Sequence, residues 1–256
     1  MILMDKNKSS TKKGVGMKEE KTIYQRIIVK LTGESFAREG DPISLSAASF
    51  IANELAQVHV LGVGIGVVVG GGNIVRGATL SKDGRIESTT ADHMGMLATV
   101  INALSLSSIL REHSIETRVQ TAIEMRAIAE PTIRDRALRH LEKGRIVIYA
   151  CGTGNPKFTT DTAAVLRASE VHADAIIKAT KVNGIYTDDP EKNRNAVLIP
   201  EITYEEVFER RLKFIDAAAV GLAMETYRKP IHVVNIFTKG NLVRVLKGEK
   251  IGSRVS

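Results

Sequence analysis

Short apolar runs alternate along the chain with longer segments in which apolar residues recur every three or four positions. The runs predict strands at residues 23–31, 64–69, 117–121, 145–150, 174–178 and 231–237. The periodic segments predict helices at residues 45–60, 92–112 and 135–143, and the capping residues Thr203 and Asp216 predict two more. Strands that alternate with helices predict an α/β fold, a three-layer αβα sandwich around a mostly parallel sheet.

The longest predicted helix, residues 92–112, carries Met94, Leu97, Ile101 and Leu104 on one face. No apolar run approaches the length of a membrane span, so we expect no membrane segment. The start of the chain is polar and lacks the apolar core of a secretory signal. The one cysteine, Cys151, has no partner for an internal disulfide. Together these features predict a cytoplasmic protein.

The first 22 residues differ from the rest of the chain. They hold six Lys against Asp5, Glu19 and Glu20 and show no periodic pattern, which predicts a disordered leader. Met17 is a candidate alternative start, because the folded pattern begins only near Ile23. Nothing later resembles a linker or a repeat, so residues 23–256 are predicted to form a single domain.

The chain carries a formal net charge of +7. Proteins that bind nucleic acids usually combine concentrated basic charge with aromatic stacking residues, whereas this chain has no Trp and 4% aromatic residues. The composition therefore predicts no nucleic-acid partner. The positive balance is compatible with small molecules that bear phosphate groups.

Glycines and basic residues follow the first two predicted strands. Lys30 stands beside the turn at Gly33, a combination that suits a phosphate clamp, with a surface lysine as the alternative. Glycines 70–72 follow the second strand, and Arg76 comes shortly after them. Three successive glycines suggest that a ligand approaches the backbone closely, because a merely flexible turn would be entropically costly.

The loop at residues 150–161 follows the strand predicted at residues 145–150 and is dense in small and hydroxyl side chains. It lies where open α/β sheets place their ligands, and it suits a polar or anionic one. Asp161, at the end of this loop, is either a helix cap or a carboxylate that orients a lysine or a phosphate-bound Mg²⁺. For Asp92, the capping interpretation is favoured over contact with sugar hydroxyls.

Residues 178–190 combine two lysines, a glycine turn, one aromatic residue and two acids after another predicted strand. This mixture suits an adenine and ribose pocket, and a long polar loop is the alternative. The chain contains no Gly-Lys dipeptide and hence no Walker A motif. It also lacks a Cys/His metal-ligand cluster and a Gly-x-Ser-x-Gly elbow, so the sequence predicts no protein-held metal.

Together these motifs resemble the amino-acid kinase superfamily and, within it, the bacterial UMP kinases. Five stretches carry the resemblance in the order that is typical of the family, at residues 30–34, 70–77, 92–99, 152–161 and 178–184. The similarity extends from about Ile23 to Gly252. The stretch at residues 152–161 distinguishes UMP kinases from acetylglutamate, carbamate and aspartate kinases.

The resemblance implies transfer of the γ-phosphoryl group of ATP to UMP, with Mg²⁺ held mainly by the ATP phosphates, in pyrimidine nucleotide biosynthesis. It implies catalytic roles for Lys30, Arg76 and Asp161, with Asp161 organising Lys30. The implied ATP-binding residues are Lys30, Leu31, Thr32, Gly33, Gly72, Arg76, Thr180, Tyr186 and Asp189. The implied UMP-binding residues are Gly71, Arg76, Asp92, Thr153, Gly154, Asn155, Pro156, Lys157, Phe158, Thr159 and Thr160. Members of the family typically form homohexamers, which GTP activates in some cases and UTP inhibits.

Three positions depart from the pattern of the family: Thr32 replaces Ser, Lys157 replaces an aromatic residue and Asn183 replaces Asp. Lys157 either adds charge near the acceptor phosphate or points to solvent. Two other functions stay open. One is a related kinase that acts on a carboxylate or carbamate, and the other is a sensor of uridine nucleotides without turnover.

Overall fold

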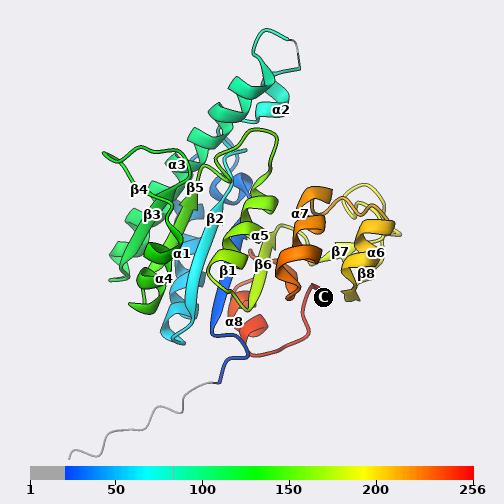
Figure 1. Ribbon diagram of the computed structural model, residues 1–256. Helices are drawn as coiled ribbons and strands as arrows, with labels where there is room; N and C mark the ends of the chain where they lie inside the picture. The colour runs from blue at the N-terminus through cyan, green and yellow to red at the C-terminus, as the bar shows by residue number, and fades with distance from the viewer. Residues whose placement is uncertain (1–20, 83) are drawn as a thin grey trace, which may run out of the picture.

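The computed structural model describes residues 21–82 and 84–256 and is built around a nine-stranded sheet (Figure 1). The strand order is β4-β3-β5-β2-β1-β6-β10-β11-β9, and every neighbouring pair is parallel except β10 with β11. These strands are β1 (Arg26–Leu31), β2 (Gly64–Val69), β3 (Thr117–Thr121), β4 (Glu130–Pro131), β5 (Ile146–Ala150), β6 (Ala175–Thr180), β9 (Glu201–Ile202), β10 (Ile231–Asn235) and β11 (Ser253–Val255). The predicted α/β fold with a mostly parallel sheet is confirmed.

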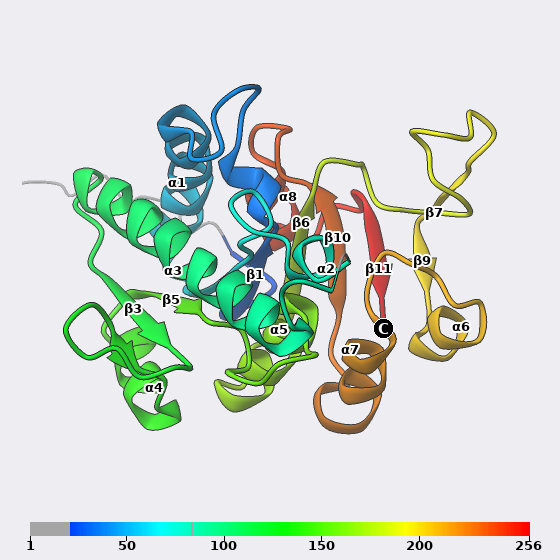
Figure 2. The same cartoon turned by 90° about the horizontal axis from the view of Figure 1, so that it is seen from above.

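Helices cover both faces of this sheet, as Figure 2 shows from above. They are α1 (Leu45–Val60), α2 (Gly77–Leu80), α3 (Ser88–Glu112), α4 (Arg134–Glu142), α5 (Thr160–Glu170), α6 (Tyr204–Glu209), α7 (Ala217–Leu222) and α8 (Asn241–Leu246), with a 3₁₀ turn at η1 (Gly33–Phe36) and a π-turn at η2 (Ala223–Tyr227). Helices α1, α3 and α8 pack on one face, and α4 to α7 pack on the other. The predicted three-layer sandwich is therefore also confirmed.

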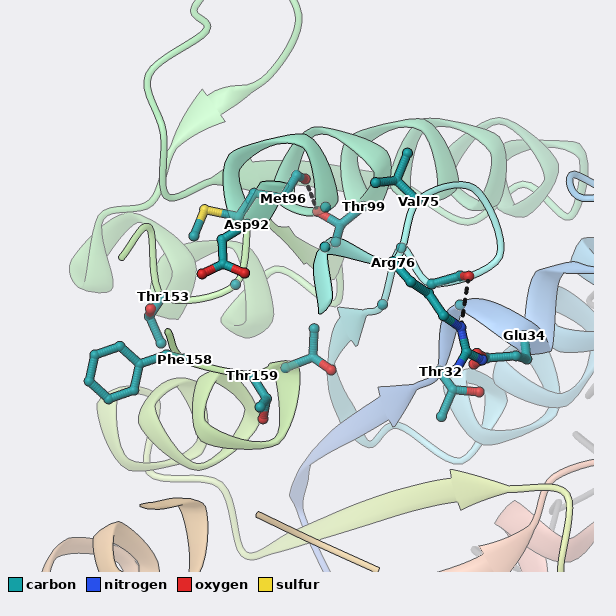
Figure 3. A pocket seen from close by; sticks show the side chains of 18 of the residues that line it. Thr32, Glu34, Val75, Arg76, Asp92, Met96, Thr99, Thr153, Phe158 and Thr159 are labelled. Atoms are coloured by element: carbon teal, nitrogen blue, oxygen red, sulfur yellow. Dashed lines mark hydrogen bonds and ion pairs between the residues drawn. The ribbon is translucent and has the colours of Figure 1, made fainter. Parts of the chain in front are cut away.

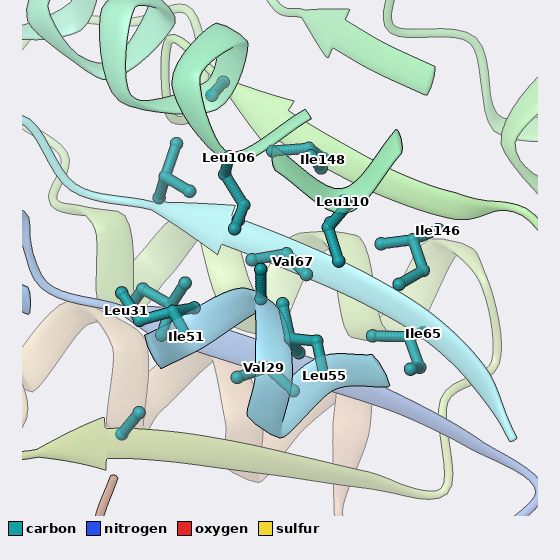
Figure 4. Packing of buried hydrophobic residues seen from close by; sticks show 14 of the residues in the cluster. Val29, Leu31, Ile51, Leu55, Ile65, Val67, Leu106, Leu110, Ile146 and Ile148 are labelled. Atoms are coloured by element: carbon teal, nitrogen blue, oxygen red, sulfur yellow. The ribbon is translucent and has the colours of Figure 1, made fainter. Parts of the chain in front are cut away.

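Successive strand residues alternate between the two apolar cores. Val29 and Leu31 of β1 belong to the core on the side of α1 and α3, where Figure 4 shows Val29 beside Leu55 and Leu31 beside Ile51. Ile28 belongs to the opposite core. Because a central parallel sheet is buried on both faces, its strands are apolar at nearly every position. This explains why short apolar runs were sufficient to find the central strands.

The predicted elements differ from the structure mainly at their ends. The first strand begins at Arg26 instead of Ile23, because Ile23 is 55% exposed and its N–H donates to the carbonyl of Leu246 outside the ladder. The caps at Thr203 and Asp216 are confirmed by side-chain bonds to the backbone N–H groups of Glu206 and Ala219. Five short strands were not predicted, because none is longer than three residues: β4, β9, β11 and the small pair β7 (Ile185–Tyr186) with β8 (Leu198–Ile199). Predictions for residues 1–20, including Met17, lie outside the described residues.

Helix α3 does not present its predicted apolar face to the sheet. Leu97, Ile101 and Leu104 are 50%, 44% and 40% exposed, whereas Leu106 and Leu110 are buried. The helix is apolar on several sides, so spacing alone could not show which side is buried. It is also long and apolar enough to cross a membrane, but 56% of the relevant window is buried within the protein, as in the core helix of a soluble protein.

Because only one face of α1 packs on the sheet, the same Leu→Ala substitution should destabilise the protein to different extents on the two faces of this helix. Leu55 is fully buried and Leu45 is 68% exposed. Leu55→Ala should lower the free energy of unfolding by about 2–5 kcal/mol, because it removes apolar contacts and leaves a cavity. Leu45→Ala should change it by about 0.5 kcal/mol or less. Urea unfolding of both variants checks this, and equal losses would contradict the assigned packing face.

Candidate active site

Loops from neighbouring strands surround a cleft of about 510 Å³ at the carboxyl edge of the sheet (Figure 3). Strands β5, β2, β1 and β6 are consecutive in the sheet and parallel, so their carboxyl ends meet at the same edge. The cleft is lined by Lys30, Thr32, Gly33, Glu34, Gly70, Gly71, Gly72, Val75, Arg76, Gly77, Thr79, Asp92, Gly95, Met96, Thr99, Gly152, Thr153, Phe158, Thr159 and Thr160. Four of the five sequence motifs contribute to this lining.

The glycines of this cleft are required by contacts between backbone segments. A Cβ atom on Gly33 would lie 2.3 Å from the backbone nitrogen of Gly72, and one on Gly71 would lie 2.7 Å from the carbonyl oxygen of Gly95. The loop after β1 thus interlocks with the loop after β2, which in turn packs on α3. The run of three glycines suggested that a ligand approaches the backbone closely. In the structure, Gly33 and Gly71 also allow the loops to pack against each other and against α3.

Asn102 of α3 holds the loop after β2 in place. Its side chain is fully buried, and its amide donates to the carbonyl oxygen of Gly70 and to Oδ1 of Asn73, both at 2.8 Å. A buried amide with its hydrogen bonds satisfied fixes the surrounding backbone firmly. Asn102 was not predicted as a site residue, because a polar residue within a helix has no local sequence signature of this role.

Two lysines share one carboxylate beneath the cleft. Lys30 and Lys178 are register partners on β1 and β6, and each is 6% exposed. Nζ of Lys30 lies 3.0 Å from Oδ1 of Asp161, and Nζ of Lys178 lies 2.5 and 2.6 Å from the two oxygens of Asp161. Lys178 belonged to a motif but received no separate role, because its link to Asp161 depends on strand pairing.

Burial and charge together set the ionisation of this cluster. Burial alone raises the pKa of Asp161, but the two lysines more than offset it, so the pKa lies below its usual value. Burial, with the charge of Lys30, lowers the pKa of Lys178 to about 8. The cluster therefore carries one carboxylate against two ammonium groups at neutral pH, which leaves net positive charge beside the cleft.

The loop at residues 151–159 is attached at both ends. Cys151 has a φ of 60°, and its N–H donates to Oγ1 of Thr99 at 2.7 Å. At the other end, Thr159 caps α5 and its hydroxyl donates to Asp216, the residue that caps α7. Asp216 was predicted only as a cap, so its contact with Thr159 is a second role that the sequence did not indicate.

Asp92 holds the middle of this loop. The capping interpretation of Asp92 is wrong, because α3 begins at Ser88 and Asp92 instead accepts a hydrogen bond from the backbone N–H of Lys157 at 3.0 Å. The side chain of Lys157 contacts the hydroxyl of Ser88 and does not line the cleft. Asp92 itself does line the cleft.

The structure brings together only part of the implied binding set. The cleft contains Lys30, Thr32, Gly33, Gly71, Gly72, Arg76, Asp92, Thr153, Phe158, Thr159 and Thr160. Leu31 is buried in the core, and Asp161 lies behind Lys30. Gly154, Asn155, Pro156 and Lys157 form the part of the loop outside the lining.

Other predicted site residues lie outside the cleft. Tyr186 and Asp189 line a cavity of about 580 Å³ together with Arg210, Arg211 and Phe214. A third cavity, of about 520 Å³, shares Glu34 with the cleft and is also lined by Lys181 and Phe237. Thr180 lies at the end of β6, where its hydroxyl donates to the carbonyl of Val182 at 2.7 Å.

The fold and the cleft define an open α/β protein whose candidate site lies at the carboxyl ends of parallel strands, where such sheets place their ligands. Residues 25–235 match the model of the amino acid kinase family. The chain therefore belongs to the amino acid kinase family, and it is a kinase.

Solved structures support this membership. UMP kinase from Bacillus anthracis is 38% identical, with a TM-score of 0.87 over 91% of this chain and 96% of that chain. UMP kinase from Ureaplasma parvum is 31% identical, with a TM-score of 0.84 over 91% and 98% of the two chains. Uridylate kinase from Archaeoglobus fulgidus is 25% identical, with a TM-score of 0.70 over 90% and 99%. The resemblance stated from the sequence is confirmed.

The lysine cluster predicts a stability loss that depends on pH. Asp161→Asn leaves two buried ammonium groups without a counter-charge and should lower the free energy of unfolding by about 3 kcal/mol near neutral pH. It also lowers the pKa of Lys178 further, so the folded state binds fewer protons than the unfolded chain. The deficit should therefore shrink as the pH rises to about 8, where the wild-type Lys178 itself loses its proton, and change little above that pH.

Urea unfolding at about pH 7 and about pH 9.5 measures this change in stability. The matched control is Asp135→Asn, which removes a carboxylate that is 70% exposed and pairs with Arg134 on the surface. Its effect should stay below about 1 kcal/mol at both pH values. A deficit of Asp161→Asn that grew with pH would contradict the charge assignment.

Proposed function

We propose that this kinase transfers the γ-phosphoryl group of ATP to UMP and forms UDP and ADP. The observation that carries the proposal is the Lys30–Asp161–Lys178 cluster, which places positive charge beneath a cleft walled by the loop at residues 151–159. The solved UMP kinases noted above support UMP as the acceptor. Such an enzyme supplies UDP in pyrimidine nucleotide biosynthesis.

The donor phosphates would lie against the loop after β1. Lys30, Thr32, Gly33 and Gly72 line this part of the cleft, and Lys30 carries a buried positive charge. The ATP nucleoside would occupy the cavity of Tyr186 and Asp189. The third cavity shares Glu34 with the cleft, and its Arg38 and Lys181 would offer further positive charge to the triphosphate.

The acceptor would lie between α3 and the loop at residues 151–159. Asp92 would contact the ribose hydroxyls, and Gly71 and Arg76 would contact the UMP phosphate. Thr153, Phe158, Thr159 and Thr160 form the wall that would surround the base and phosphate. Phe158 is 52% exposed at this wall, which suits a side chain that becomes covered when a nucleobase binds.

Phosphoryl transfer needs positioning and charge neutralisation more than covalent help from the protein. Lys30 would stabilise charge on the transferred group, while Asp161 keeps both lysines oriented. Asp161 is bonded to two lysines and Glu34 to Arg76, so these carboxylates already have cationic partners. Mg²⁺ is therefore expected to arrive with ATP as the MgATP substrate, with the phosphates as its ligands.

Acceptor identity is tested by ADP release with MgATP and each of UMP, CMP, acetylglutamate and carbamate. We expect turnover with UMP that exceeds turnover with the other acceptors. Activity confined to acetylglutamate or carbamate would instead identify a related kinase. Binding of UMP without turnover by any acceptor would identify a nucleotide sensor.

Lys30→Ala tests the proposed catalytic role of Lys30 in the same assay. It should lower kcat for UMP by about 100-fold or more, because it removes a charge from the reacting phosphate. Lys143→Ala is the matched control, because it removes an exposed lysine at the end of α4 that does not line the cleft, and it should leave kcat nearly unchanged. A near-normal kcat for Lys30→Ala would contradict the proposed role.

We also propose that the enzyme assembles as a homohexamer in the cytoplasm, with GTP and UTP as candidate effectors. The exposed apolar face of α3, formed by Leu97, Ile101 and Leu104, supports self-association. Three large apolar side chains in a row on one helix face are typical of a contact surface. A two-fold axis near Ile101 would bring Leu97 of one copy against Leu104 of the other.

Ile101→Glu is predicted to break this contact, because it would bury a charge at the centre of the apolar face. Sedimentation velocity at micromolar protein should then show species smaller than the wild-type assembly. Val60→Glu, at the 75% exposed end of α1, should leave the assembly intact. An unchanged mass for Ile101→Glu would exclude this face as a subunit contact.

A further inference from the structure

The carboxylate of Glu34 contacts the arginine that the proposed function assigns to phosphate. Nη2 of Arg76 donates a hydrogen bond to Oε1 of Glu34, and both side chains line the cleft. An acid in direct contact with a phosphate-binding arginine is unexpected, because it opposes the binding of anions. Its presence there needs a physical explanation.

The local backbone directs Glu34 toward Arg76. Glu34 lies in the short turn η1, where it follows Gly33 in the loop that interlocks with Gly72. A Cβ atom on Gly72 would lie 3.2 Å from Oε1 of Glu34, which is tight for a carbon–oxygen contact. The glycine at this position therefore leaves room for the carboxylate to reach the guanidinium.

Charge balance shows what the contact does to the cleft. Among its lining residues, Lys30 and Arg76 are cationic, whereas Glu34 and Asp92 are anionic. Glu34 thus cancels the charge of Arg76 while the cleft holds no ligand. The side chains of Arg76 and Glu34 are 61% and 31% exposed, so water screens their attraction and the pair can exchange partners.

A phosphate group is the stronger partner for Arg76. It carries more negative charge than a carboxylate and can accept two parallel hydrogen bonds from a guanidinium. Once released, the carboxylate of Glu34 has Lys181 as another cationic neighbour, since both residues line the third cavity. Exchange therefore leaves neither Glu34 nor Arg76 without a counter-charge.

We propose that Glu34 is a built-in competitor that occupies Arg76 in the free protein and is displaced by a phosphate of the substrate. The contact keeps the guanidinium extended at the cleft between turnovers, at the expense of affinity. Glu34 is thus a positioning residue that sets how tightly phosphates bind. The inference rests on the proposed function only for the identity of the substrate, because the exchange requires an anion and not a particular nucleotide.

The test measures binding of UMP and of inorganic pyrophosphate to Glu34→Gln by isothermal titration calorimetry. Loss of the competing charge should tighten the binding of one or both ligands by about 2- to 5-fold, the range expected for an exposed ion pair. Glu39→Gln is the matched control, because Glu39 is an exposed acid that lines the same third cavity. It should leave both affinities unchanged.

A double-mutant cycle separates the exchange from a general charge effect. In an Arg76→Gln background, Glu34→Gln should no longer tighten binding, since the contact is already absent. Unchanged or weaker binding by Glu34→Gln alone would overturn the proposal, and so would a gain that persists without Arg76. If UMP is not phosphorylated but the pyrophosphate result holds, the proposed function fails and the exchange at Arg76 stands.

Discussion

The pairing of β1 with β6 is the constraint on which the candidate site depends. It places Lys30 and Lys178 at the same level of the sheet, where two buried ammonium groups repel each other. The carboxylate of Asp161 offsets this repulsion by pairing with both ammonium groups. Asp161 lies in the first turn of α5. The sheet, the helix and the loop that precedes the helix are therefore bound together by one shared charge.

The rest of the cleft is rigid for a different reason. Gly33 and Gly71 let backbone segments approach more closely than any side chain would permit, and Asn102 then binds the resulting loop to α3. Thr99 and Asp92 attach the loop at residues 151–159 to the same helix. Helix α3 is thus the common support for both walls of the cleft and holds the two loops in a fixed relation to each other.

The two kinds of cation in the site differ in how they are neutralised. Lys30 and Lys178 are buried and share Asp161, so their positions change little without unfolding part of the core. Arg76 is exposed and paired with Glu34 across the mouth of the cleft, so it can change partners with little rearrangement. A buried cation cluster at the base of the cleft and an exposed arginine on its wall would suit the binding and release of phosphates that we propose.

The sequence by itself determined three things: the layered α/β fold, the family, and the strand ends at which the candidate site lies. It could do so because strand ends and turn residues are encoded locally. The two caps at Thr203 and Asp216 followed from the same local chemistry. Only the tertiary structure decided which side of α3 is buried, since that helix is apolar on several sides. It also decided that Lys178 meets Asp161, that Asp92 holds Lys157 and that Glu34 meets Arg76. These contacts depend on strand register, helix rotation and the packing of distant loops, none of which a local pattern can specify.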